Sequence, residues 1–201
     1  VAFLSKVPLL GDPVLHPLHL PEFPDRQGDT RGVLQADFRM TDGSVLTGFS
    51  VHFPAPFHPT PMRVAAYEHL NKLRAALPDH HHVFAAGDFN TTSTEDEREG
   101  LLDRYARPGW TLAHDVGCDD CPGTHYYSRD DTWSFLDMIL FSPARGENAT
   151  SRIRAKSVAI ANKNPAQVSE AGTPERFRSA SQTGVSDHWP MIATIELTEK
   201  Q

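Results

Sequence analysis

The chain has 201 residues, of which 39% are hydrophobic and 22% charged, and this composition excludes a disordered or collagen-like protein. There are 26 acidic residues against 19 Lys and Arg residues, which gives a net charge of −7. This charge argues against a protein held on nucleic acid by bulk positive charge, although a bound cation would offset the repulsion between the chain and an anionic substrate. Two cysteines are too few for a disulfide-based fold, and no run of eighteen apolar residues predicts a membrane-spanning helix.

The first part of the chain predicts strands followed by a helix. Residues 1–4 are a strand-like apolar run, and Val33–Phe38 and Val45–Phe53 are rich in β-forming residues. The Asp42-Gly43 pair between the last two runs is a strong hairpin signal. An amphipathic helix that ends before Pro78 is indicated by apolar residues three or four positions apart, at Met62, Ala66, Leu70, Leu73 and Leu77.

The rest of the chain predicts mostly strands. Val83–Ala86 is short, continuous and apolar, as in a buried strand, and a second helix is expected around Leu101 and Leu102. Further strands are expected at Trp110–Ala113, Thr124–Tyr127, Phe135–Phe141, Arg152–Ile160 and Met191–Leu197. Two sheets packed face to face with helices outside would bury this pattern, so we predict one α/β domain over residues 1–201.

Polar side chains of catalytic type lie beside apolar strands in the segments Ser50–Phe53, Gly87–Asn90, Phe135–Met138 and Ser186–Pro190. Catalytic groups are common where a rigid strand ends in a loop. Each segment also has a purely structural interpretation. Asp88 and Asn90 could bond their own backbone in a turn, and an Asp-His pair could lie in a surface loop.

Asp137 is a carboxylate inside an apolar strand, and a buried carboxylate needs a partner. One interpretation is a structural salt bridge to an arginine. The sharper hypothesis is that Asp137 accepts a proton from His188, which fixes the tautomer of the imidazole and favours its charged form.

Taken together and in this order, the segments resemble the endonuclease/exonuclease/phosphatase superfamily. Its members include pancreatic-type deoxyribonuclease, abasic-site endonucleases, neutral sphingomyelinases and inositol polyphosphate 5-phosphatases. The resemblance covers about Val1 to Leu197, and its most specific parts are Gly87–Asn90, Ser186–His188 and Trp133–Asp137. It implies a four-layer α/β/β/α sandwich that hydrolyses phosphate esters with a divalent cation.

The resemblance also implies a catalytic role for each matching residue. Asp88 would orient or deprotonate the attacking water, and Asn90 would hold the phosphate. His188 would contact the scissile phosphate while Asp137 orients it, and His52 would donate to a phosphate oxygen. Donors fixed in advance around developing charge are worth roughly 3–4 kcal/mol each.

The metal and substrate contacts follow from the same resemblance. Asp187, with Asp88, would lie on the metal side, and oxygen ligands favour Mg²⁺ or Mn²⁺. The loop that precedes the Asp137 strand would place Arg129 and Trp133 against substrate, although simple packing explains Trp133 equally well.

One departure from the family pattern concerns the N-terminal region. Members normally begin with two further strands, which carry an Asn and then a Glu that is the main metal ligand. Here Val1–Pro8 resembles the strand that follows them, and Glu22 lies in a Pro-rich loop. We therefore expect that the N-terminal part of the domain is missing, and that these 201 residues alone bind Mg²⁺ weakly and are inactive.

Two cysteines lie between two histidines in the pattern His114-x3-Cys118-x2-Cys121-x3-His125. The pattern allows a tetrahedral zinc site, a local Cys118–Cys121 disulfide or free thiols. A disulfide gives a slight indication of an exported protein.

The sequence thus predicts a metal-dependent phosphodiesterase whose substrate is a phosphate ester, with nucleic acid favoured. Phosphate contacts are available from scattered basic residues, namely Arg63, Lys72, Arg74, Arg152, Arg154, Lys156 and Lys163. The alternatives are a sphingomyelinase-like enzyme or inositol-phosphate-type phosphatase, and a non-catalytic protein that keeps the fold as a binding surface.

Overall fold

A six-stranded sheet forms the centre of the computed structural model, which describes residues 1–145 and 151–197. Its strand order is β1-β2-β3-β4-β8-β5. The strands are β1 (Val14–His16), β2 (Val33–Arg39), β3 (Val45–His52), β4 (His82–Asp88), β8 (Asp137–Ser142) and β5 (Thr111–Leu112). Neighbours are antiparallel except β3 and β4, which are parallel because a helix connects them.

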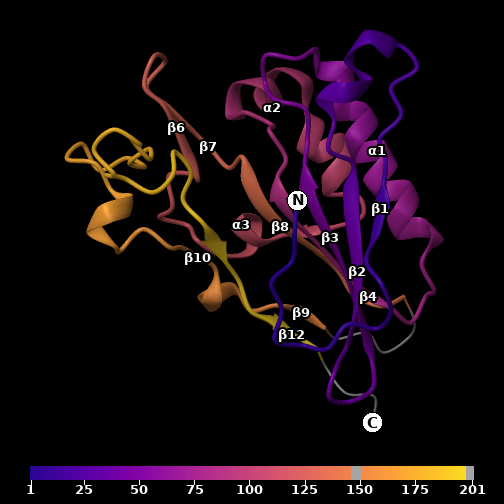
Figure 1. Ribbon diagram of the computed structural model, residues 1–201. Coiled ribbons are helices and arrows are strands. Elements are labelled where there is room, and N and C mark those ends of the chain that lie inside the picture. The colour runs from indigo at the N-terminus through magenta and orange to yellow at the C-terminus, as the bar shows by residue number, and fades with distance from the viewer. Residues whose placement is uncertain (146–150, 198–201) are drawn as a thin grey trace.

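That helix, α1 (Thr60–Ala76), covers one face of the sheet (Figure 1). Its apolar stripe packs against β3 residues such as Phe49 and Val51, which are fully buried. Leu77 is extended because Pro78 follows it, so the helix ends where the sequence predicts. Since side chains alternate along a strand, His52 lies on the opposite face from Val51, away from α1.

Shorter elements surround this sheet. The helical segments are η1 (Pro24–Asp29), α2 (Ser93–Glu99), the π-helical η2 (Leu102–Ala106), α3 (Ala113–Val116), η3 (Ala155–Ser157) and η4 (Pro165–Gln167). Two-stranded pairs are formed by β6 (His125–Tyr127) with β7 (Thr132–Ser134), β9 (Arg152–Ile153) with β12 (Ile195–Glu196), and β10 (Ala159–Ile160) with β11 (Met191–Ile192).

The β9–β12 and β10–β11 pairs lie across the large sheet from α1 (Figure 1). A second apolar cluster forms there around Phe141, Ile153 and Val158. The architecture is therefore the α/β sandwich that the sequence predicts. In the described residues the second β layer consists of these short pairs.

Three predicted strands are wrong in detail. Residues 1–4 pair with no strand, and Phe3 instead packs edge-on against Phe38 and Phe84. Arg152–Ile160 and Met191–Leu197 are each divided into two short strands. The two breaks have a common physical cause. Ser157 Oγ donates to the carbonyl of Arg154 and accepts from Thr194 N, so this one side chain interrupts strand pairing in both segments where they lie side by side.

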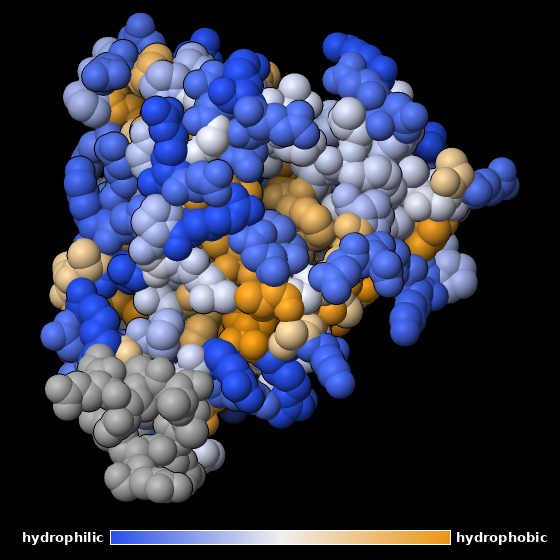
Figure 2. Space-filling model, turned by 180° about the vertical axis from the view of Figure 1, so that it is seen from behind, coloured by the Kyte–Doolittle hydropathy of each residue, from blue (hydrophilic) through white to orange (hydrophobic). Residues whose placement is uncertain are grey.

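Most of the surface seen from behind is hydrophilic, and hydrophobic residues reach it mainly near the middle (Figure 2). Among residues 1–145 and 151–197, every helix is too short or too polar to cross a bilayer.

Candidate active site

Three of the expected site residues form a row across the sheet. The strand register pairs His52 at the end of β3 with Asp88 at the end of β4, and Asp88 with Asp137 at the start of β8. Paired positions on neighbouring strands carry their side chains on the same face, with strands about 4.8 Å apart. The row therefore lies on the face turned away from α1, and His52 Nε2 is 3.6 Å from Asp88 Oδ2.

The backbone around Asp88 takes a form that few residues allow. Gly87 has φ +140°, and a Cβ there would lie 2.1 Å from the carbonyl oxygen of Val51, so only glycine fits. Asn90 is left-handed at φ +51°, which Asn tolerates. Its backbone N–H donates to Asp88 Oδ1 (2.8 Å) and its Nδ2 donates to Phe53 O (3.0 Å). Asp88 and Asn90 thus do form a turn, and that turn fixes the Asp88 carboxylate.

His188 reaches the row from a distant part of the chain. Its Nδ1 lies 2.7 Å from Asp137 Oδ2, so the imidazole donates to the carboxylate and leaves Nε2 free. Thr124 holds both partners, since its Oγ1 accepts from Asp137 N and its carbonyl accepts from Trp189 N. Asp137 is therefore paired with His188, and no arginine salt bridge to it is found among the described residues.

The surroundings shift the pKa values of Asp88, His188 and His52 in different directions. Burial, followed by the neighbouring Asp137, raises the pKa of Asp88 to about 6. Burial is the largest single influence on His188 and lowers its pKa. The hydrogen bond to Asp137 and the nearby carboxylate charges together outweigh burial, so the pKa of His188 is raised above its usual value. Burial lowers the pKa of His52. A carboxylate that titrates near neutrality beside an imidazolium is a common arrangement for acid–base chemistry.

His125 is next to the site, although the sequence suggested it only as part of a zinc pattern. Its ring lies 4.6 Å from the His188 ring, and its Nδ1 is 2.9 Å from the Asp187 carbonyl. The pattern does not form a zinc site, because Cys118 and Cys121 are joined as a disulfide and His114 stacks on Phe135. His125 directly follows Thr124, which accepts a hydrogen bond from Asp137 N, and this contact brings His125 to the site. Nothing in the sequence indicates that contact.

The remaining predicted site residues lie around the row. Asp187 is half-exposed and its Oδ2 is 3.9 Å from Arg176 Nε. The Trp133 ring packs against Trp189, at 5.2 Å between centroids, so it supports the residue that follows His188. Arg129 is exposed in the turn between β6 and β7.

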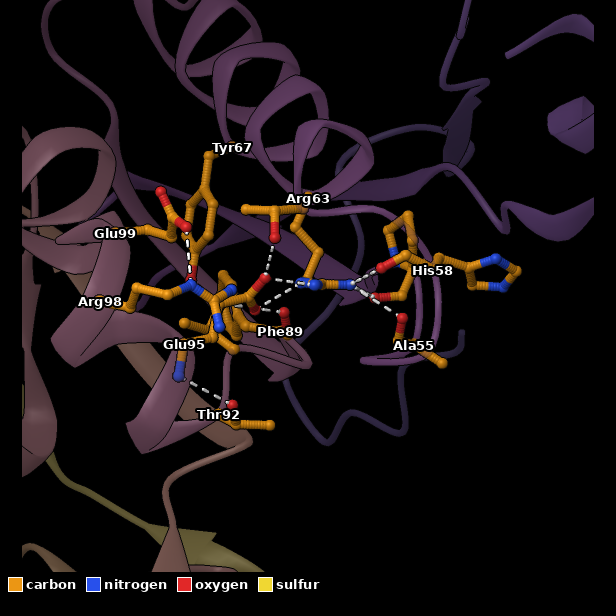
Figure 3. Close-up of polar contacts among 12 residues, drawn as sticks. Ala55, His58, Arg63, Tyr67, Phe89, Thr92, Glu95, Arg98 and Glu99 are labelled. Carbon is orange, nitrogen blue, oxygen red and sulfur yellow. Dashed lines mark hydrogen bonds and ion pairs between the residues drawn. The ribbon is translucent and has the colours of Figure 1, made fainter.

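A buried ion pair holds the two loops that leave the row (Figure 3). Arg63 on α1 donates from Nε to Glu95 Oε2 on α2 at 2.7 Å, and its Nη1 donates to the carbonyls of Ala55 and His58. The segment after His52 and the helix after Asn90 are thereby fixed to α1. Arg63 was expected to be free for phosphate, and this is wrong because it is almost fully buried.

Several other arginines in that basic set are also engaged. Arg74 donates to Ser142 Oγ and lies over the Trp110 ring, and Arg152 and Arg154 both pair with Glu196. These pairs leave less free positive charge than the sequence suggests.

The donor chemistry of the row fits a hard divalent cation. Asp88 and Asp137 in the row, and Asp187 next to His188 in the chain, carry oxygen ligands of the kind that Mg²⁺ prefers. The adjacent carboxylates of Asp88 and Asp137 repel each other, as the raised pKa of Asp88 reflects, and a cation would relieve that repulsion. Within the described parts of the chain, no three His, Cys, Asp or Glu side chains converge to form a complete cage.

The model of the endonuclease/exonuclease/phosphatase family matches residues 1–188, so this chain belongs to that family of phosphoesterases, whose enzymes generally use divalent metals. No curated protein sequence matches closely enough to count as a relative.

Solved structures with the same fold include D. rerio TDP2 complexed with single strand DNA product, at TM-score 0.65 and 13% identity over 94% of this chain. A family protein from Bacteroides thetaiotaomicron matches at TM-score 0.63 and 17% identity, also over 94% of this chain. A mannosyl-6-phosphatase from the same organism matches 82% of this chain at TM-score 0.55 and 17% identity. The chain spans 68%, 66% and 57% of these three proteins, respectively.

Proposed function

We propose that this chain carries the catalytic face of a divalent-metal-dependent phosphodiesterase that acts on nucleic acid. The observation that carries the proposal is the row of His52, Asp88 and Asp137 with His188 bonded to Asp137 at 2.7 Å. A purely structural role requires none of these groups to meet. The TDP2 neighbour complexed with single strand DNA product supports nucleic acid as the substrate class.

In this proposal each side chain has a defined role. Asp88, whose pKa is raised to about 6, is ionised at neutral pH and accepts a proton from the attacking water. His188, kept charged by Asp137, donates from Nε2 to a phosphate oxygen, where negative charge accumulates. His52 and the second Nδ2 hydrogen of Asn90, whose first is donated to Phe53 O, would provide neutral hydrogen-bond donors to the phosphate.

Asp88 and Asp187 would hold the cation. When bound, Mg²⁺ or Mn²⁺ neutralises charge on the phosphate and offsets the repulsion between the substrate and an acidic chain. Arg129 would contact substrate from the turn between β6 and β7, and Trp133 would support the His188 segment from behind.

The test is a substrate panel assayed with Mg²⁺ and with a chelator, on the protein expressed from its full coding sequence. Single-stranded DNA, RNA, a sphingomyelin, an inositol phosphate and a sugar 6-phosphate cover the candidate classes. We expect metal-dependent cleavage of the nucleic acids, lost in Asp88→Ala and His188→Ala while both variants remain folded. Preferred hydrolysis of the sugar phosphate would instead favour a phosphomonoesterase, as the mannosyl-6-phosphatase neighbour suggests. Unchanged activity in both variants would contradict the assignment.

A further inference from the structure

A cation outside the row, Arg31, is placed beside it by the turn into β2. Gly32 has φ +68°, and a Cβ there would lie 2.5 Å from the carbonyl oxygen of His16, so the chain passes very close to β1 at this point. Val33 then pairs with Val51 on β3. Continuing that register places Gly32 opposite His52 and Arg31 opposite Phe53, one residue past the end of β3. Arg31 and His52 line the same small surface crevice.

Arg31 is exposed and has no ion-pair partner among the residues that the structure describes. Two other arginines near the site differ in this respect, since Arg63 is bound to Glu95 and Arg176 lies near Asp187.

The distance of Arg31 from Asp88 and His188 determines which phosphate of a substrate it can bind. The row crosses β3, β4 and β8, and Arg31 lies at its β2 end, so Asp88 is about two strand spacings away, or roughly 10 Å. His188 is bonded to Asp137, one strand further. A phosphate seated between Asp88 and His188 therefore lies away from the backbone of Arg31, with His52 between them.

We propose that Arg31 binds a second anionic group that flanks the scissile phosphate, so that the site selects an extended polyanion over an ester with a single phosphate. This deepens the proposed function and rests on it. Nucleic acid has the required chemistry, because one strand carries a phosphate about every 3.4 Å along a duplex axis. A planar guanidinium binds such a phosphate through two parallel hydrogen bonds.

The experiment compares Arg31→Gln with Arg31→Lys and with a matched control, Arg39→Gln. Arg39 is also exposed and lies at the opposite end of β2. Each change is made in the His188→Ala protein, so that bound DNA is not cleaved. Affinities for a fluorescent single-stranded tetranucleotide and for thymidine 5′-monophosphate are measured by anisotropy and competition in Mg²⁺, and folding of each variant is checked by urea denaturation.

We expect Arg31→Gln to weaken tetranucleotide binding about tenfold and mononucleotide binding less than twofold. Arg31→Lys should restore most of the loss because it keeps the charge, and Arg39→Gln should change neither affinity. The salt dependence of tetranucleotide binding should fall by about one phosphate contact in Arg31→Gln.

The inference would be overturned if Arg31→Gln weakened the binding of both ligands equally or did not weaken it. The absence of any tetranucleotide binding would also overturn it. Its failure can be told from that of the proposed function, because hydrolysis is measured separately in the substrate panel. Cleavage of DNA without any dependence of its binding on Arg31 would overturn only the selection for a flanking phosphate. Binding that depends on Arg31 without hydrolysis of any substrate would uphold the selection and reject the phosphodiesterase.

Discussion

The Arg63–Glu95 pair and the Asp137–His188 pair each join a carboxylate to a cationic side chain, but they differ in exposure. The side chains of the first pair are 2% and 6% exposed, and those of the second are 26% each. The buried pair has its donors used up by Glu95 and by loop carbonyls. In the second pair the imidazole bonds Asp137 through Nδ1, and its Nε2 has no hydrogen-bond partner among residues 1–145 and 151–197. Complete burial fixes geometry, whereas partial burial leaves a group able to meet a substrate.

The sharpest test of this difference is His188→Gln. Because His188 is proposed to donate to the phosphate, we expect kcat to fall about 10²–10⁴-fold, or about 3–5 kcal/mol in barrier. The free energy of unfolding should change by less than about 1.5 kcal/mol, since the pair is partly exposed. Steady-state kinetics and urea denaturation measure the two effects. The control is His80→Gln, because His80 is an exposed histidine. An equal loss of activity in this variant would contradict a catalytic role specific to His188.

The opposite outcome is expected for Arg63→Met. Removing one partner leaves Glu95 buried and unpaired, which costs about 3–5 kcal/mol of stability. The matched control is Arg98→Met, because Arg98 pairs with Glu99 at the surface and its loss should change the free energy of unfolding far less. Urea denaturation compares them. Similar values for the two variants would show that burial does not distinguish these pairs.

Asp88 connects activity to stability through pH. Its folded-state pKa is raised from 3.8 to about 6, so ionisation destabilises the fold. This cost is absent below pH 3.8, grows as pH rises toward 6, and is complete above it. Asp88→Asn should therefore be inactive yet more stable at pH 8, by up to about 3 kcal/mol, and no more stable near pH 3.5.

Unfolding of both proteins in urea at the two pH values tests this expectation. His80→Gln again provides the control, because an exposed side chain should leave the pH dependence unchanged. A gain in stability for Asp88→Asn that is the same at both pH values would indicate a packing effect rather than removal of a buried charge.

The smallest effect is expected for Trp133→Phe. The Trp133 ring packs on Trp189, beside His188, and an aromatic pair of this kind is worth about 1 kcal/mol. If packing is its role, stability falls by about that amount while KM is unchanged. A raised KM with unchanged stability would instead place Trp133 against substrate.

Much of the central sheet could be predicted from local sequence. The β2–β3 hairpin, α1 and β4 lie within a few residues of their expected bounds, because alternation, a four-residue apolar period and a terminal proline act locally. Residues 152–160 and 191–197 could not be predicted, since their breaks depend on a hydrogen bond between Ser157 and Thr194. Phe3 likewise packs on strands far along the chain.

The site shows the same division. The spacing of Asp88 and Asn90 and the sequence around His188 led to the prediction of their roles, and the family that this pattern predicts is confirmed by the match over residues 1–188. The contribution of His125 and Arg31 could not be read in this way, because His125 stands in a pattern that suggested zinc and Arg31 stands in no motif. Their neighbours at the site are brought to them by loops.

The sequence by itself predicted the family, and it offered a turn at Asp88 and Asn90 as one interpretation. Local strand alternation also accounts for the position of His52 on the face away from α1. These depend on residue types at short separations. Only the tertiary structure decided that Asp137 pairs with His188 rather than with an arginine, and which arginines are bound to acidic partners. It also decided that Cys118 and Cys121 form a disulfide rather than a zinc site with His114 and His125. The first two outcomes depend on burial and on contacts between residues that are remote in sequence, and no local pattern encodes them. The third depends on the surrounding fold, in which His114 stacks on Phe135.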